Sequence, residues 1–137
     1  MLEALQFSSP DPVALSGLSD EEWKKALAFA DRAQLTLPLG LISRDHLPDW
    51  VRCRTDKNLA CNAERWQRTK ITFQELAAAF EAEGLEFAVL KGFSHCPHFV
   101  DNPRRRWQSD LVMLFRQEDV LQARDVAAEF LKQAGLR

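Results

Sequence analysis

Lys91 and Gly92 form a pair of residues suited to phosphate binding. They directly follow the apolar run Phe87 to Leu90, and Gly92 allows a sharp backbone turn that leaves amide groups free. If a helix begins near Phe93, its first N–H groups have no partner within the helix and its dipole is positive there. A phosphate could bind at such a helix start, with Lys91 as a point charge. The alternative is a charged residue at a strand end, followed by a turn glycine.

Asp110 is a candidate metal ligand. It stands at the start of the apolar segment Leu111 to Phe115, which predicts a strand with Asp110 among its opening residues. Side chains alternate along a strand, so residues 110, 112 and 114 are expected to share one face. A carboxylate there could bind Mg²⁺. The alternative is a carboxylate that reaches solvent or accepts a hydrogen bond from a backbone amide.

Two predicted strands position these residues. The segment Phe87 to Leu90 is short, apolar and preceded by Gly84, which is typical of a strand buried on both faces. With a helix beginning near Phe93 and a strand ending at Phe115, the order is strand, helix, strand. This order usually gives neighbouring parallel strands.

The other segments are predicted to be mostly helical. Ser19 and Glu22 have the spacing of a capping box, whereas Pro38 and Gly40 interrupt the helical pattern. Residues 1–17 lack periodicity and predict a loose arm with at most a short helical turn. The predicted helices are Asp20–Gln34, a short turn beginning at Leu41-Ile42, a helix with Pro48 at its first position, Asn58–Glu83 ended by Gly84, and a last helix from Glu118-Asp119 to Gly135.

The motifs around the two strands resemble a known family. They are Leu90-Lys91-Gly92, Asn102-Pro103 with Arg106, and the run from Asp110 to Asp119. Together they resemble the uncharacterised nucleotidyltransferase family of the polymerase-beta-like superfamily. In that family a strand ending in Leu-Lys-Gly precedes a strand reading Asp-Ile-Asp-Leu-Leu-Val, followed by Arg-Pro-Glu-Asp. The resemblance covers residues 85–137 well and the preceding helical region loosely. The family fold implies a mixed sheet.

The resemblance implies a nucleoside triphosphate and Mg²⁺ or Mn²⁺ as ligands. Asp110 would be the metal ligand and catalytic carboxylate. Lys91, Gly92 and Ser94 would lie near the phosphates. Arg106, four residues before Asp110, would contact a phosphate or stabilise developing charge. The acceptor is open: a sugar, a nucleic acid, a protein and a small molecule all fit the family.

Val112 departs from the family pattern at the position of the second metal-binding carboxylate. In two-metal phosphoryl transfer, paired carboxylates hold two cations about 3.5–4 Å apart, but valine has no lone pair to offer. A third carboxylate, expected on a later strand, is missing because the sequence ends at Arg137. The sequence therefore resembles the front half of such a protein with a degenerate active site, and impaired catalysis is expected. Whether 137 residues are a full product or a fragment is open.

Two further clusters have weaker interpretations. His95, Cys96 and His98 could suggest zinc or a Cys-His nucleophile, but a second pair of zinc ligands and a nucleophile turn are both missing. Arg104 to Arg106 with Trp107 suggests a phosphate clamp with an aromatic ring for base stacking. The alternative is a solvated basic loop.

The composition predicts a soluble, cytoplasmic globular protein. Its 137 residues with 46% hydrophobic content are enough for one compact unit. A net charge of -2 gives no general attraction to nucleic acid or anionic membranes. Three cysteines without close pairing favour reduced thiols, and the sequence lacks a signal peptide or a membrane-spanning run.

We therefore expect an α+β fold with an N-terminal helical layer, residues 1–83, packed on a small sheet in a nucleotidyltransferase-like core, residues 84–137. The leading function is a nucleotidyltransferase-like protein that binds a nucleoside triphosphate and a divalent metal. The alternative is a catalytically inactive binding or interaction module on the same fold. An open sheet edge would then serve a homodimer or another protein partner.

Overall fold

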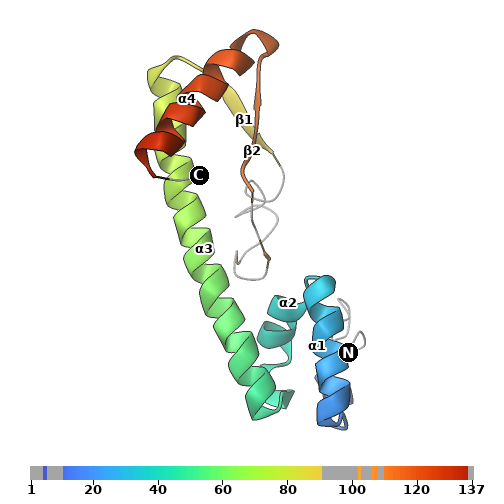
Figure 1. The fold of residues 1–137 in the computed structure, drawn as a ribbon. Helices are drawn as coiled ribbons and strands as arrows, with labels where there is room; N and C mark the ends of the chain where they lie inside the picture. The colour runs from blue at the N-terminus through green and yellow to red at the C-terminus, as the bar shows by residue number, and fades with distance from the viewer. Residues whose placement is uncertain (1–4, 6–10, 91–101, 103–105, 108–109, 136–137) are drawn as a thin grey trace. The chain divides into compact units, whose positions relative to one another are not determined.

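The computed structural model describes residues 5, 11–90, 102, 106–107 and 110–135 (Figure 1). In these ranges the chain forms four α-helices and a two-stranded sheet, which confirms the α+β class. The elements are α1 (Asp20–Arg32), α2 (Thr36–Ile42), α3 (Asp49–Ala82), β1 (Phe87–Leu90), β2 (Val112–Phe115) and α4 (Val120–Gln133), with 3-10 turns at Pro12–Leu15, Arg44–His46 and Gln117–Asp119.

The chain divides into two compact units. Unit 1 comprises residues 1–64 and 102–107, and unit 2 comprises residues 65–101 and 108–137. Each unit has its own hydrophobic core. The division between residues 83 and 84, expected from the sequence, stays a prediction.

Helix α1 begins at the predicted capping box. The backbone N–H of Glu22 donates to Oγ of Ser19 over 3.4 Å, and the N–H of Ser19 donates to Oε2 of Glu22 over 2.8 Å. The Ser19 hydroxyl also donates to that carboxylate over 2.6 Å. The hydrogen bond from the Ser19 hydroxyl has the largest effect on the pKa of the Glu22 carboxyl group, and the bond from the Ser19 N–H has the next largest. Both hold this pKa below its ordinary value. Two N–H groups that would lack partners at the helix start are thereby satisfied.

The core of unit 1 joins α1 to segments on either side of it. Its fully or almost fully buried side chains are Leu15, Trp23, Leu27, Leu39, Leu47 and Val51. Leu15 belongs to the short 3-10 turn Pro12–Leu15, which agrees with the single helical turn predicted for the N-terminal arm. Because Leu15 is completely buried, this part of the arm is anchored in the core.

Helix α2 corrects the prediction that Pro38 and Gly40 interrupt the helical pattern, since both lie inside it. Pro38 is in the first turn, where a missing N–H costs no helical hydrogen bond. Gly40 is buried, and a Cβ placed there would lie 2.8 Å from Cβ of Thr55 and 3.3 Å from Cδ1 of Leu59. Glycine at this position therefore permits a close approach of α2 to α3.

We expect Gly40→Ala to lower the free energy of unfolding by about 1–3 kcal/mol, because the added methyl group overpacks the contact with Thr55. Urea denaturation followed by circular dichroism measures the change. Gly17→Ala is the matched control, since a Cβ at Gly17 meets nothing within 4 Å. Equal stability of the two variants would contradict the close approach.

Helix α3 merges two helices that the sequence predicts separately. It runs without a break from Asp49 to Ala82, and no glycine or proline interrupts this range. Pro48 stands just before the helix, where its carbonyl accepts a hydrogen bond from the N–H of Arg52 over 2.9 Å. Gly84 has the left-handed φ of 70° that its position after the helix predicts. The N–H of Leu85 then donates to the carbonyl of Phe80 over 3.0 Å and closes the helix end.

Strands β1 and β2 are antiparallel, so the expectation of parallel neighbours was wrong. The residue pairs are Phe87 with Phe115, Ala88 with Leu114, Val89 with Met113 and Leu90 with Val112. The last residue of β1 pairs with the first residue of β2. The chain therefore leaves and re-enters the sheet at the same end, which excludes a parallel crossover.

The sheet is buried on one face, which corrects the prediction that Phe87 to Leu90 is buried on both. Phe87 and Val89 are half-buried, whereas Ala88 and Leu90 are exposed. On β2, Leu114 is 57% exposed. This alternation is typical of an antiparallel sheet with one covered face.

The core of unit 2 is built around Phe80 of α3. The ring of Phe80 lies edge-on to Phe115 at a centroid distance of 4.9 Å and to Phe87 at 5.6 Å. The other buried residues of this core are Leu85, which precedes β1, and Ala123 of α4. Half-buried apolar side chains that pack against it are Leu76, Phe87, Met113, Phe115, Val126 and Ala127. One end of α3, the covered sheet face and α4 thus share one core.

Candidate functional site

Asp110 is exposed and lies two residues before β2. The sequence predicts it among the opening residues of the strand, but the strand begins at Val112 because the pairing with β1 starts at Leu90. An exposed carboxylate at this end of the sheet is accessible to a cation from solvent.

The described acidic residues that closely follow β2 in the sequence lie at its opposite end. Glu118 and Asp119 belong to the turn Gln117–Asp119, and the whole of β2, which is about 13 Å long, lies between them and Asp110 along the chain. Val112 is half-buried and offers no ligand atom. In the described part of the chain, no group of three or more His, Cys, Asp or Glu side chains could hold a metal ion.

Asp110 as a single carboxylate fits one mode of Mg²⁺ binding. Mg²⁺ keeps several water ligands and is commonly held by one or two carboxylates together with phosphate oxygens of the substrate. The donor set therefore suits a cation that arrives with a nucleotide better than a cation held by protein ligands alone.

Arg106 belongs to unit 1 and is exposed. Its backbone carbonyl accepts a hydrogen bond of 3.2 Å from Nδ2 of Asn62, a residue of α3 that is 1% exposed. This bond fixes the backbone at Arg106 against α3. Because Asp110 belongs to unit 2, no two of the predicted site residues that the structure describes lie in the same unit.

The remaining predicted site residues lie outside the described ranges. They are Lys91, Gly92 and Ser94, together with His95, Cys96, His98, Arg104 and Arg105 of the weaker clusters. The described cysteines, Cys53 and Cys61, are exposed and free, and their reduced state stays a prediction.

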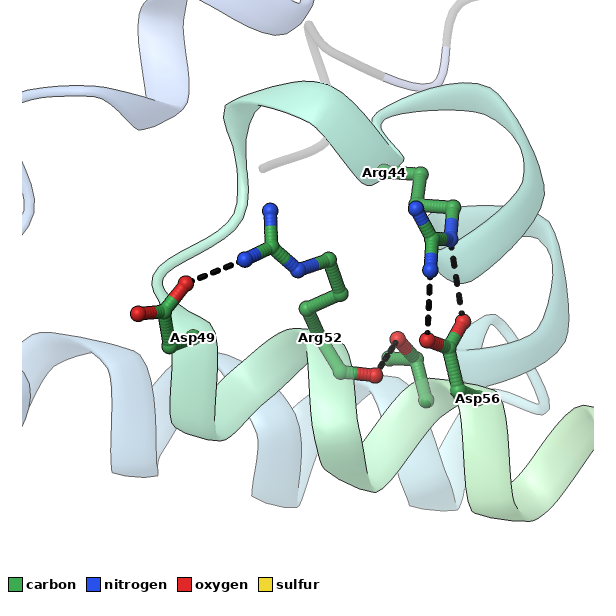
Figure 2. A network of polar contacts seen from close by, with 5 residues as sticks. Arg44, Asp49, Arg52 and Asp56 are labelled. Carbon is green, nitrogen blue, oxygen red and sulfur yellow. Dashed lines mark hydrogen bonds and ion pairs between the residues drawn. The ribbon is translucent and has the colours of Figure 1, made fainter.

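A network of charged residues lies around the start of α3 (Figure 2). Arg44 donates from Nε and Nη2 to the two carboxylate oxygens of Asp56 over 3.1 and 2.8 Å. This pairing lowers the pKa of Asp56 and raises the pKa of Arg44. Arg52 donates to Asp49. Each guanidinium in the network thus has a carboxylate partner, and we assign the network a structural role at the helix start.

Unit 1 also contains a pocket of about 350 Å³ that sequence reasoning did not find. It is lined by Asp31, Gln34, Thr36, Leu37, Arg54, Asn58 and Trp107. These residues come from the end of α1, the start of α2, α3 and the described segment 106–107. Only Trp107 carried a signal in the sequence, as an aromatic ring beside arginines.

Asp31 organises one side of this pocket. Its Oδ1 accepts a hydrogen bond of 2.7 Å from the hydroxyl of Thr36, and its Oδ2 pairs with Nη2 of Arg54. The carboxylate and the guanidinium neutralise each other. Thr36 and Leu37 are 7% and 4% exposed, so this side of the pocket belongs to the packed part of unit 1.

Comparison with known proteins gives one family match. The family described as "Uncharacterised nucleotidyltransferase" matches residues 19–131. No match was found among curated proteins or solved structures. No helix in the described ranges is long and apolar enough to cross a membrane.

Proposed function

The chain belongs to the uncharacterised nucleotidyltransferase family, and from this membership we propose that it binds a nucleoside triphosphate together with Mg²⁺ or Mn²⁺. The match over residues 19–131 carries the proposal. It includes Lys91, Gly92, Ser94, Arg106 and Asp110, the five residues to which the family resemblance gives a role.

The pairing of β1 with β2 supports a shared role for Lys91 and Asp110. Leu90 pairs with Val112, Lys91 follows Leu90 directly, and Asp110 precedes Val112 by two residues. This order along the chain is the basis for proposing that Lys91 and Asp110 act on the same ligand.

In this proposal each residue has a distinct task. Asp110 would hold the divalent cation, which neutralises phosphate charge when it is bound. Lys91, Gly92 and Ser94 would bind phosphate oxygens through an ammonium group, a backbone amide and a hydroxyl. Arg106 would contact a phosphate as a guanidinium donor. The acceptor stays open.

Val112 supports impaired catalysis within this proposal. Nucleotidyl transfer by two cations requires a second carboxylate close to the first, and Val112 offers an apolar side chain instead. The proposed protein therefore binds the nucleotide with one carboxylate ligand and transfers the nucleotidyl group slowly or not at all.

We expect Asp110→Ala to weaken Mg²⁺-dependent nucleotide binding about tenfold or more, which corresponds to about 1.4 kcal/mol. The physical reason is the loss of the carboxylate that links the cation to the protein. Isothermal titration calorimetry with ATP, GTP, CTP and UTP, with and without Mg²⁺ or Mn²⁺, measures the effect. Because Asp110 is exposed, the variant is expected to keep the fold of the wild type, and circular dichroism checks this point.

Val112→Asp is the complementary variant. If the missing carboxylate limits the site, this change strengthens metal-dependent binding or produces nucleotidyl transfer. Asp45→Ala serves as the control, since Asp45 is exposed in the turn Arg44–His46 of unit 1. Nucleotide binding that is equal with and without metal, and equal in wild type and Asp110→Ala, would refute the metal role of Asp110.

An inactive binding module is the second candidate function. It is favoured by the uncovered sheet face, on which Leu114 is 57% and Leu90 is 40% exposed. Val112 lies on the same face by alternation and adds to its apolar character. Absence of any nucleotide binding in the titrations above would leave this function as the better explanation.

A further inference from the structure

The pocket of unit 1 combines apolar side chains with polar groups. Trp107 and Leu37 contribute an aromatic ring and an aliphatic side chain. Trp107 is 39% exposed, so part of the ring is accessible to a ligand. A planar ligand gains contact area and stacking energy from an indole ring.

The charged residues of the pocket form a neutral pair. Both oxygens of the Asp31 carboxylate are engaged, one by the Thr36 hydroxyl and one by Arg54. An anion would have to compete with Asp31 for the guanidinium, and a cation would have to compete with Arg54 for the carboxylate. The pocket therefore favours a ligand without net charge.

Two side-chain amides supply the remaining polar groups. Gln34 and Asn58 line the pocket, and neither amide is hydrogen-bonded to another side chain or to the backbone within the described part of the chain. Each primary amide offers two donors and an acceptor. A primary amide can therefore pair with the edge of a heterocyclic ring that carries a donor and an acceptor side by side, such as N–H next to C=O or N–H next to a ring nitrogen.

We propose that this pocket binds a planar heterocycle with an amide-like edge, the chemical class of the nucleobases, as a free nucleoside or as part of a nucleotide. The volume of about 350 Å³ is near the lower end of the range for small-molecule sites and suits one such ring system. The inference stands on residues of unit 1 alone and does not rest on the proposed function.

The backbone of Gln34 supports a role beyond folding. Gln34 follows α1 with φ of 58°, a left-handed conformation in which glycine is more favourable. The N–H of Leu35 donates to the carbonyl of Ala30 over 2.8 Å across this turn. Gln34→Gly therefore removes the amide from the pocket without a cost to the turn, and this makes it a variant that keeps its fold.

Calorimetric titration of the full chain with adenosine, guanosine, cytidine and uridine, without metal, tests the proposal. At least one nucleoside is expected to bind at millimolar concentration or below. Trp107→Ala is expected to weaken that binding about tenfold through loss of stacking. Trp107→Phe retains an aromatic ring and is expected to keep most of the affinity. Gln34→Gly is expected to weaken it several-fold through loss of a hydrogen bond.

Trp50→Ala is the matched control. Trp50 is also 39% exposed, but it does not line the pocket, and its Nε1 donates to Asp20 over 3.1 Å. Nucleoside affinity is expected to be unchanged in this variant. Thermal melting of each variant checks the fold, and Gln34→Gly is expected to melt no lower than wild type.

Three results would overturn the proposal. These are no binding of any nucleoside, equal affinity of wild type and Trp107→Ala, or preferential binding of inorganic phosphate that Arg54→Gln abolishes. The Asp110→Ala variant separates this inference from the proposed function. Nucleoside binding that persists in Asp110→Ala supports the pocket, whereas metal-dependent triphosphate binding without nucleoside binding supports the proposed function alone.

Discussion

Replacement of Phe80 by alanine is expected to lower the free energy of unfolding of unit 2 by about 3–5 kcal/mol. Phe80 is 2% exposed and its ring contacts the rings of Phe87 on β1 and Phe115 on β2. The substitution removes these contacts and leaves a cavity between α3 and the sheet. A loss of this size is a large fraction of the stability of a small domain.

Urea denaturation followed by circular dichroism measures this loss. Phe29→Ala is the matched control, because Phe29 is 40% exposed on α1 and its truncation opens no cavity. Phe80→Leu is an intermediate variant that keeps part of the buried volume and is expected to lose less stability than Phe80→Ala. Equal losses for Phe80→Ala and Phe29→Ala would show that Phe80 does not anchor the core of unit 2.

Replacement of Trp23 by alanine is expected to destabilise unit 1 by about 3–5 kcal/mol. The indole ring is 1% exposed and lies among Leu15, Leu27, Leu39 and Val51. Leu27 belongs to α1 itself, whereas Leu15, Leu39 and Val51 come from three other segments, so the truncation weakens the packing of α1 against all three. A destabilisation of this size is expected to raise the unfolded population of unit 1 greatly.

The helical signal in circular dichroism is the appropriate measurement, because the substitution also removes a fluorophore. Trp50→Ala has the same chemical change at a half-exposed site and loses one hydrogen bond to Asp20. It is expected to cost about 1 kcal/mol or less. If Trp50→Ala destabilised the chain as much as Trp23→Ala does, the buried cluster would not be the main source of stability in unit 1.

Features with a local cause were predictable from the sequence. Ser19 and Glu22 form the capping box that their spacing predicts, because both partners lie within one helical turn. Gly84 has the left-handed conformation that its position after a helix predicts. The α+β class followed from a long amphipathic pattern and short apolar runs.

Features with a tertiary cause were not predictable from the sequence. Gly40 resembles a helix breaker because its contact with Thr55, fifteen residues later, does not enter the local pattern. The run Phe87 to Leu90 is apolar throughout, so it lacks the alternation of apolar and polar residues that would indicate a single covered face. The same run also carries no information on strand direction, which the pairing with β2 determines.

Of the two candidate sites, one was predictable from the sequence and the other was not. Asp110 was recognisable as a lone carboxylate before an apolar run, although the strand begins two residues later than predicted. The pocket of unit 1 was not recognisable, because Asp31, Arg54 and Trp107 meet only through the fold. Residue types alone identify a site when its residues are close together in the sequence, whereas the residues of this pocket are spread from Asp31 to Trp107.

The position of Phe80 has a consequence for the order of folding. Phe80 contacts Phe87 across seven residues and Phe115 across thirty-five. Closing the longer loop costs about 1.4 kcal/mol more chain entropy than closing the shorter one. The hydrogen bond from Leu85 to the carbonyl of Phe80 further favours the shorter loop. The end of α3 and β1 can therefore form an early local nucleus, and β2 joins it as the late, non-local step that limits the folding rate of unit 2.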